Sequence, residues 1–572
     1  MTDNGELSFR FSCPRKGRFS CEKQAGEPGV DCYRVRMAWD GLETPPATVM
    51  RFGFPATDTY SVFECRRFDR AKNWGGVERT SRLAADLPLL QLISKKGKNR
   101  YLFTLSDVKT PVKLRVKCDY TDMTAEGEII FFTELTDPID CYECVLRIDT
   151  RPIPFTQALK DASGWFAALG YVPARVPEAA YDPLYSTWYS YLTKVTAEDV
   201  LRECRAAKEL GMDTVIIDDG WQRQDGASVY GYCGDWKPFP VKFPDMAGLI
   251  RALHGLGMKV LLWYAVPFVG HYSDQYAGFQ GKYLNEADGC DCAVLDPRFP
   301  EVRAFLADTY VSALKAWKPD GFKLDFIDRF RTNGVVSEGM DTASVEDATF
   351  RLLSEIYRAL TEENPDVLIE FRQPYSGPVI GAFGNMIRVW DCPNDGLTNR
   401  VSSLNLRLTS SAAVHSDPIR WHRDESPEQT AVLLWGTLFS VPQISVRLAE
   451  LGPEQAAVLR NYLGFWRAHR DTLMKGELTV QSQECLFSLV SSSLGEETVA
   501  LCSAQNYVDV SPFRRAYLCN LTEMGTLAVG TVPGTRITVR DCLGRTVEEQ
   551  TAQAELCSVK VPLGGLAELS RT

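Results

Sequence analysis

Residues 196–222 read TAEDVLRECRAAKELGMDTVIIDDGWQ and contain the signals of an amphipathic helix followed directly by a buried strand. Thr196 and Asp199 have the spacing of a capping box, and Gly211 supplies a stop signal for the helix. The apolar run at 214–217 then ends in two carboxylates. This order is typical of one βα unit of a parallel α/β protein. The apolar face of the predicted helix consists of Val200, Leu201, Cys204 and Ala207.

The same alternation of apolar strands and amphipathic helices extends from residue 184 to about residue 475. Eight strands over about 290 residues fit a closed (β/α)8 barrel. The predicted strands lie at 184–190, 214–219, 259–266, 320–326, 367–372, 385–391, 412–418 and 441–446.

Short strands between turn signals occupy the chain before and after this region. Each of these flanking parts is expected to form a β-sandwich. The prediction is a multidomain α/β protein with an N-terminal β-domain at 1–165, a catalytic (β/α)8 barrel at 166–475 and a C-terminal β-sandwich at 476–572.

Composition and charge exclude several classes of partner. The net charge of -11 and the pI of 5.3 give no basic surface for nucleic acid or anionic membranes. No apolar run is long enough to cross a bilayer, and residues 1–13 show no secretion signal. Seventeen cysteines without a repeating spacing favour reduced thiols, so a cytoplasmic enzyme is expected. The close pairs Cys141/Cys144 and Cys290/Cys292 lack a second pair, so no metal site is predicted.

Polar residues follow the apolar runs of the predicted barrel strands, where barrel enzymes place their active sites. One such aspartate is often only a helix cap or an ion-pair partner. Carboxylates on several strands together favour a site that cleaves glycosides, in which one carboxylate attacks and a second carboxyl protonates the leaving oxygen. The strand-end polar residues are Asp218, Asp219, Lys323, Asp325, Glu370, Arg372, Arg388, Asp391, His415 and Asp417.

Aromatic residues gather at the same strand ends and can serve as platforms for sugar rings. Each of them taken alone is also a normal core residue. They are Trp188, Tyr189, Trp221, Trp263, Tyr264 and Trp390.

Three motifs, DDGWQ at 218–222, DGFKLDFID at 320–328 and an arginine-containing strand ending at Asp391, resemble glycoside hydrolase family 36. This is the clan D family of melibiase-type α-galactosidases, and the resemblance implies an N-terminal β-supersandwich, a barrel and a small C-terminal β-domain. It further implies that Asp325 is the nucleophile and Asp391 the acid/base, with no cofactor. The implied substrate-binding residues, together with strand-end neighbours, are Trp188, Asp218, Asp219, Trp221, Trp263, Tyr264, Lys323, Glu370, Arg372 and Arg388.

The sequence departs from the family pattern in three strands. WDCPND at 390–395 has an extra residue between its two aspartates, so Asp395 is the alternative acid/base, although Asp391 is favoured because it ends the predicted strand. Strand three reads WYAVPF and strand five EFRQPY, without the family's acidic and glycine-rich patterns. These positions shape the sugar pocket.

The expected function is therefore a retaining α-glycosidase that hydrolyses terminal α-linked galactose or a related sugar in an oligosaccharide or glycoside. Alternatives of the same class are an α-N-acetylgalactosaminidase, another α-glycosidase and a transglycosylase of the raffinose-synthase kind. A metal-dependent hydrolase is disfavoured because, of five histidines, only His415 ends a predicted strand. An inactive sugar-binding protein would require the loss of one catalytic carboxylate. Assembly into a homo-oligomer stays open.

Overall fold

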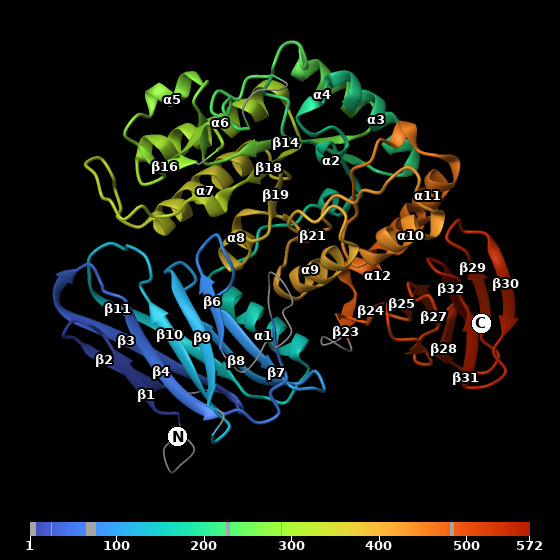
Figure 1. The fold of residues 1–572 in the computed structure, drawn as a ribbon, viewed down its shortest axis with the longest axis horizontal. Helices are drawn as coiled ribbons and strands as arrows, with labels where there is room; N and C mark the ends of the chain where they lie inside the picture. The colour runs from blue at the N-terminus through green and yellow to red at the C-terminus, as the bar shows by residue number, and fades with distance from the viewer. Residues whose placement is uncertain are drawn as a thin grey trace.

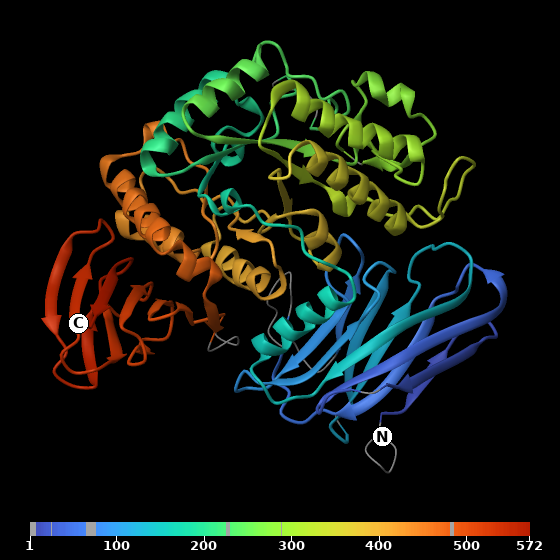
Figure 2. The same cartoon turned by 180° about the vertical axis from the view of Figure 1, so that it is seen from behind.

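The computed structural model describes residues 7–24, 26–63, 76–119, 121–224, 229–287, 289–480 and 486–571. Along this chain an antiparallel β-sandwich is followed by a parallel barrel ringed by helices, and then by a second sandwich (Figure 1). Seen from behind, the sandwiches lie on opposite sides below the barrel (Figure 2). Helix α1 (Phe155–Ala168) contacts strand β8 (Asn99–Leu105) of the first sandwich and helix α9 (Gly396–Thr409) of the barrel.

The described barrel strands are all parallel and form a closed ring. The last strand pairs with the first, and Val441 bridges His415. Every strand predicted for the barrel is confirmed. Their bounds are β12 Leu184–Ser186, β13 Thr214–Ile217, β14 Lys259–Ala265, β18 Gly321–Asp325, β19 Leu368–Arg372, β20 Met386–Arg388, β21 Ala413–His415 and β22 Gln443–Ile444.

Helix α3 (Ala197–Leu210) begins and ends where its capping signals predict. In this helix Thr196 accepts a hydrogen bond from the backbone N–H of Asp199 at 3.2 Å, and the Asp199 carboxylate accepts one from the backbone N–H of Thr196 at 3.1 Å. Gly211 ends the helix with φ 97°, in the left-handed region that favours glycine. Further barrel helices are α2 Trp188–Tyr191, α4 Met246–Gly255, α6 Pro300–Trp317, α7 Val345–Glu363, α8 Pro378–Phe383, α10 Pro427–Gly436, α11 Pro453–Ala468 and α12 Arg470–Lys475.

An insertion after β14 was not predicted. It contains the short helix α5 (Asp274–Gly278) and an antiparallel sheet of strands β15 (Phe268–Gly270), β17 (Cys292–Leu295) and β16 (Tyr283–Ala287). β15 and β17 are apolar but only three and four residues long, and β16 carries Asn285 and Glu286 in place of an apolar pattern, so hydrophobic periodicity gives little signal for this sheet.

The first sandwich packs two antiparallel sheets around an aromatic core, in which the ring centre of Phe103 lies 5.2 Å from those of Phe52 and Phe54. One sheet has the order β1-β4-β10-β9-β6 and the other β2-β3-β11-β8-β7-β5. Their bounds are β1 Phe9–Ser12, β2 Arg18–Lys23, β3 Val30–Glu43, β4 Thr48–Pro55, β5 Ser61–Phe63, β6 Val77–Ser81, β7 Leu89–Ile93, β9 Val112–Asp119, β10 Thr124–Phe131 and β11 Ile139–Asp149.

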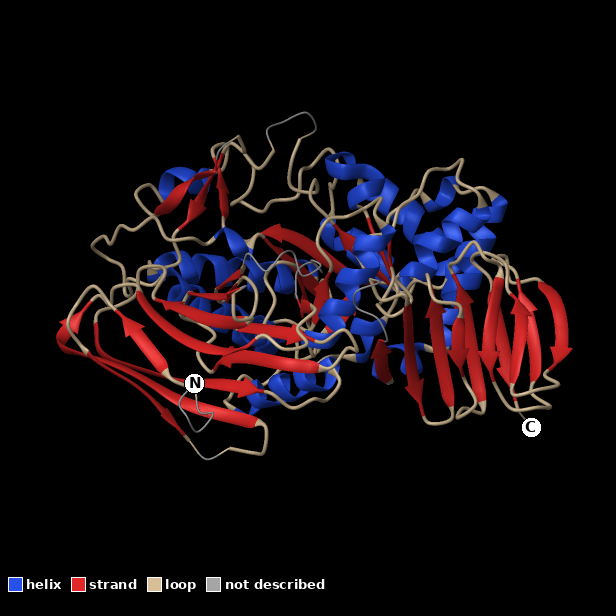
Figure 3. Cartoon of the chain, turned by 60° about the horizontal axis from the view of Figure 1, so that its bottom comes forward, coloured by secondary structure: helices blue, strands red, loops and turns tan. Residues whose placement is uncertain are grey.

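The C-terminal sandwich packs a larger sheet, β23-β24-β25-β27-β32-β29-β30, against a smaller one, β26-β28-β31 (Figure 3). No helix among the described residues is long and apolar enough to cross a membrane. The strand bounds are β23 Glu477–Val480, β24 Leu489–Leu494, β25 Glu497–Cys502, β26 Tyr507–Asp509, β27 Arg515–Asn520, β28 Thr526–Gly530, β29 Arg536–Arg540, β30 Thr546–Thr551, β31 Leu556–Lys560 and β32 Leu566–Ser570.

The barrel interior changes from apolar to polar along its axis. At the amino end the inward side chains form an apolar cluster that Ala180 covers. Because side chains alternate along a strand, the residues two positions farther on also face inward. The apolar layer consists of Leu184, Ile216, Leu261, Leu368, Met386 and Ala413, and the next layer of Ser186, Asp218, Trp263, Lys323, Glu370, Arg388 and His415.

The capping box of α3 gives a prediction about stability. Thr196→Ala should lower the free energy of unfolding by about 1 kcal/mol, because the backbone N–H of Asp199 loses its acceptor. Urea denaturation measures this loss. Thr196→Ser keeps a hydroxyl acceptor and should stay within about 0.5 kcal/mol of the wild type, so equal losses in the two variants would contradict the capping role.

Candidate active site

Asp325 is the last residue of β18, and donors surround its carboxylate. Trp263 Nε1 donates to Oδ2 at 3.0 Å, and Arg372 Nε donates to Oδ1 at 2.6 Å. The backbone N–H of Phe326 also donates to Oδ1, at 2.8 Å, and the Tyr375 hydroxyl lies 3.4 Å from the same oxygen. Both carboxylate oxygens are therefore held in a fixed orientation.

The electrostatic surroundings keep Asp325 ionised. Burial alone would raise its pKa, but the positive charges of Arg372, Lys323 and Arg388 and the hydrogen bond from Trp263 lower that pKa well below its ordinary range. A buried carboxylate that stays charged near three cations is the state that a nucleophile requires.

Asp218 and Lys323 form a buried ion pair at the same end of the barrel. Lys323 Nζ donates to Asp218 Oδ2 at 2.6 Å, and both side chains are almost fully buried. The backbone N–H of Asp218 donates to the Thr187 hydroxyl at 2.9 Å. This pair joins the end of β13 to β18 near Asp325.

Asp219 is held by a turn that directly follows β13. The chain turns at Gly220, where φ is +122° and an added Cβ would lie 2.7 Å from the Thr193 backbone. Asp219 Oδ1 accepts from Gln222 Nε2 at 2.8 Å, and Arg223 lies 3.7 Å from Oδ2. Burial raises the pKa of Asp219 to about 6, although Gln222 and Arg223 partly offset it.

Glu370, in the middle of β19, lies in the floor of the site. Its Oε2 accepts from Gln443 Nε2 at 2.5 Å, and Arg388 Nε lies 4.0 Å from Oε1. Burial raises the pKa of Glu370 to about 7, opposed by Lys323, Arg388 and Gln443. Glu370 was predicted to bind substrate, but it is fully buried beneath the strand ends.

Arg388 connects two aspartates of different exposure. Its Nη1 donates to Asp417 Oδ1 at 2.7 Å, and its Nη2 donates to Asp391 Oδ1 at 2.9 Å. Asp417 also accepts from the Tyr189 hydroxyl at 3.1 Å and from the backbone N–H of Cys392 at 2.8 Å. Burial raises the pKa of Asp417 to about 7.

Asp391 and Asp395 lie in different surroundings. Strand β20 ends at Arg388, so Asp391 lies three residues beyond the strand and not at its end as predicted. Its side chain is 55% exposed, and its pKa is lowered because Arg388, Lys323 and Arg372 outweigh burial. Asp395 is the N-cap of α9 and accepts from the backbone N–H of Thr398 at 2.8 Å. The structure thus places Asp391 beside the charged cluster and Asp395 at a helix start.

The aromatic residues divide into core and surface. Trp221 and Tyr264, predicted to contact substrate, are fully buried, and Trp221 Nε1 donates to the Trp263 carbonyl at 3.0 Å. A substrate contact does not fit these two rings, because neither has exposed surface. Trp188 is half-buried at the start of α2, and Trp390 is 39% exposed.

Two polar residues of the site, Tyr375 and Gln443, were missed in the sequence. Tyr375 donates to the Leu324 carbonyl at 2.9 Å beside Asp325, and Gln443 of β22 donates to Glu370. Gln443 was visible as a polar residue inside an apolar strand, which is a signal for an inward-facing partner. Tyr375 follows a turn and carries no periodic signal.

His415 is directed away from the carboxylates. Its Nε2 lies 2.8 Å from the Ala180 carbonyl, and burial lowers its pKa to about 4. In the part of the chain that the structure describes, no group of three or more His, Cys, Asp or Glu residues could hold a metal ion.

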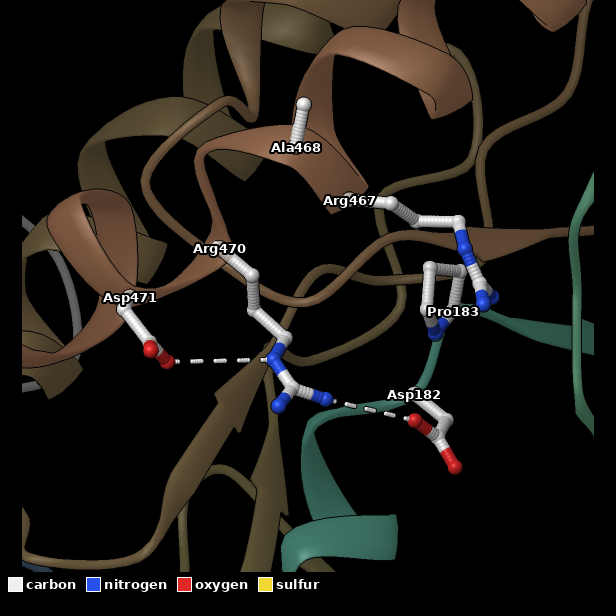
Figure 4. A pocket seen from close by; sticks show the side chains of 6 residues that line it. All are labelled: Asp182, Pro183, Arg467, Ala468, Arg470 and Asp471. Carbon is white, nitrogen blue, oxygen red and sulfur yellow. Dashed lines mark ion pairs between the residues drawn. The ribbon is translucent and has the colours of Figure 1, made fainter.

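A pocket of about 310 Å³ lies at the opposite end of the barrel, since it includes Pro183 directly before β12 (Figure 4). Arg470 pairs with Asp182 at 3.6 Å and with Asp471 at 3.9 Å, as the dashed lines show. Arg467 donates to the Gly211 carbonyl at 2.8 Å. Its arginines are already paired, so this pocket offers no free charge for a ligand.

Comparison with known proteins decides the family of the barrel. Residues 177–434 match the Melibiase family model. These residues form a melibiase domain. The α-galactosidase AgaA of Geobacillus stearothermophilus is 25% identical over 240 residues, which cover 40% of this chain and 32% of AgaA. The A type blood α-D-galactosamine galactosaminidase of Flavonifractor plautii is 26% identical over 230 residues, which cover 36% of this chain and 20% of that protein.

The fold of the whole chain resembles a solved enzyme. The crystal structure of the GH36 α-galactosidase AgaA covers 100% of this chain, and 88% of AgaA is covered, at a TM-score of 0.62 and 16% sequence identity. This confirms the predicted barrel with flanking β-domains around the melibiase domain. The aligned segments of the curated relatives span a third or less of their own lengths.

The raised pKa of Glu370 predicts a pH effect on stability. Between pH 4.5, the ordinary pKa of a glutamate, and about pH 7, the folded melibiase domain keeps a proton on Glu370 that the unfolded chain has lost. The contribution of Glu370 to the free energy of unfolding therefore decreases as the pH rises from 4.5 to about 7. The unfolding free energy of the wild type minus that of Glu370→Gln should fall over the same range.

Urea denaturation at several pH values measures this difference. Glu362→Gln, an exposed change on α7, serves as the control and should give a difference that does not vary with pH. A flat difference for Glu370→Gln would mean that Glu370 is ionised in the folded protein.

Proposed function

We propose that this chain is a retaining α-glycosidase that hydrolyses terminal α-linked galactose or a related sugar. The observation that carries the proposal is Asp325: a buried carboxylate at the end of a barrel strand, kept ionised by cations and oriented through both oxygens. A charged, oriented and desolvated carboxylate fits nucleophilic attack on an anomeric carbon.

The reaction is a double displacement. Asp325 attacks the anomeric carbon while Asp391 protonates the departing glycosidic oxygen, and the sugar becomes esterified to Asp325. Asp391 then removes a proton from a water molecule while the water oxygen attacks the anomeric carbon; the ester bond to Asp325 breaks, and the sugar is released with retained configuration. Substrate covers the exposed side of Asp391 and removes water from it, which raises its pKa and favours the protonated acid.

The polar residues on β13 and β18 support recognition of a sugar. Asp218 and Asp219 carry acceptors for ring hydroxyls, and Lys323 adds a donor beside them. Trp188 offers a half-buried ring to a sugar face. The relatives favour galactose, since one variant of AgaA was solved in complex with raffinose.

The cysteines support a reducing compartment. The described cysteines are all free thiols, and such a set is typical of cytoplasmic proteins. We therefore propose the cytoplasm as the site of action.

Removal of the nucleophile should abolish the covalent route. Asp325→Ala is expected to lower kcat on a nitrophenyl α-galactoside by a factor of about 10⁴ or more. Azide should restore part of the turnover, because the vacated space admits a small anion. Steady-state kinetics with and without azide test this, and activity near the wild-type level in Asp325→Ala would contradict the assignment.

The loss of activity on removal of the acid should depend on the leaving group of the substrate. A nitrophenolate leaves without a proton but a sugar alcohol does not, so Asp391→Ala should lose about 10² to 10⁴-fold more activity on an oligosaccharide than on the activated glycoside. Asp395→Ala is the matched control, since it loses only a helix cap, and it should affect both substrates equally. A selective loss in Asp395→Ala instead would reassign the acid.

A further inference from the structure

Arg372 occupies a position beside the nucleophile that the proposed mechanism does not use. It is the last residue of β19, and its Nε donates to Asp325 Oδ1 at 2.6 Å. Its Nη1 donates to the Gln373 carbonyl at 2.8 Å. No hydrogen bond of Nη2 to any described residue is seen, and the side chain is 13% exposed. Two of the five N–H groups of the guanidinium are thus used within the protein, and those of Nη2 are left for a bound molecule.

The guanidinium is held rigidly. Its central carbon lies 5.2 Å from the ring centre of Phe326 and 5.6 Å from that of Tyr375. Such cation–π contacts, together with the ion pair to Asp325, fix the plane of the group. Arg372 thus presents a fixed positive charge at the edge of the nucleophile.

The position of Asp325 limits which part of a sugar Arg372 can reach. Asp325 must lie next to the anomeric carbon, so a group in contact with Asp325 faces one of the two ring atoms that flank this carbon. These are the ring oxygen and carbon 2. The transition state resembles an oxocarbenium ion, in which the ring oxygen carries positive charge. A guanidinium beside the ring oxygen would repel that charge, so the productive orientation turns carbon 2 toward Arg372.

The order of the strands agrees with this orientation. In the ring of strands, β13 and β14 lie on one side of β18, and β19 lies on the other. Asp218 and Asp219, which follow β13, are therefore separated from Arg372 by the nucleophile. Asp218 and Asp219 can therefore bind hydroxyls on the part of the sugar away from carbon 2. Arg372 can bind the substituent on carbon 2, next to the reacting carbon.

We propose that Arg372 selects the substituent on carbon 2 of the sugar, accepting a hydroxyl or an acetamido group and rejecting a protonated amine. The inference rests on the proposed α-glycosidase function. A guanidinium has donors and no acceptor, so it can bind an oxygen but not an ammonium group. Two positive charges brought together in a desolvated site oppose binding strongly. The substrate class is therefore a neutral 2-hydroxy or 2-acetamido sugar rather than galactosamine.

Three nitrophenyl α-glycosides test the proposal: galactoside, 2-acetamido-2-deoxygalactoside and 2-amino-2-deoxygalactoside. At about pH 6 the wild type should prefer the galactoside over the amino sugar by a factor of about 100 in kcat/KM. Arg372→Gln should reduce this preference at least about tenfold, although its activity on every substrate falls. From about pH 6 to about pH 9 the amine loses its proton, so the preference should decline in the wild type but not in Arg372→Gln.

Arg329→Gln is the matched control. Arg329 is exposed and lies four residues after the nucleophile. Its substitution removes the same charge as Arg372→Gln but leaves the contacts of Asp325 intact, so the preference should stay within about twofold. If Arg372→Gln fails to fold, the preference for the galactoside over the amino sugar is measured instead in Arg372→Lys and, as a function of pH, in the wild type.

The possible failures are distinguishable. If the wild type hydrolyses none of the α-glycosides, the proposed function is wrong and the inference is wrong with it. If the galactoside is hydrolysed but the amino sugar is an equally good substrate, or if Arg372→Gln leaves the preference unchanged, the α-glycosidase stands and the role of Arg372 is overturned.

Discussion

A closed parallel barrel directs every second side chain of its strands into one shared interior, and in this protein the layer below the strand ends carries charge. Each charge there needs a partner, because an isolated buried ion costs several kcal/mol. Lys323 is paired with Asp218 at 2.6 Å, and Arg388 is paired with Asp417 at 2.7 Å. The partners come from different strands. The site therefore depends on closure of the barrel, and no single motif creates it.

The same network divides the carboxylates into two groups. Asp325 and Asp391 lie near several cations, and their pKa values are lowered. Glu370 and Asp417 lie deeper, where burial prevails and raises both pKa values to about 7. At neutral pH Asp325 and Asp391 are thus the anions, and the two deep groups are partly protonated. The cations that lie near both Asp325 and Asp391, which are Arg372, Lys323 and Arg388, offset the mutual repulsion of these two anions.

The sequence predicted the barrel strands well, because an apolar run that stops at a polar residue marks a strand, but it placed the end of β20 at Asp391 instead of Arg388. It could not predict the orientation of rings. Trp221 and Tyr264 lie near strand ends in the sequence but have no exposed surface, and only the packing around β14 decides this. It also could not rank Asp391 against Asp395. That distinction depends on Arg388, whose Nη2 reaches Asp391, and on the helix that begins after Asp395.

Arg372 joins two properties that a mutation cannot separate. Its charge is the largest single influence that lowers the pKa of Asp325, and in the proposed mechanism its Nη2 faces the substituent on carbon 2 of the sugar. A change that relaxes selection on the sugar would therefore also make the nucleophile easier to protonate. The chain could widen its substrate range only if another cation replaced this charge. Lys323 is unsuited to that task, since its ammonium group is already held by Asp218. In the proposed mechanism, specificity and reactivity are thus coupled through the ion pair between Arg372 and Asp325.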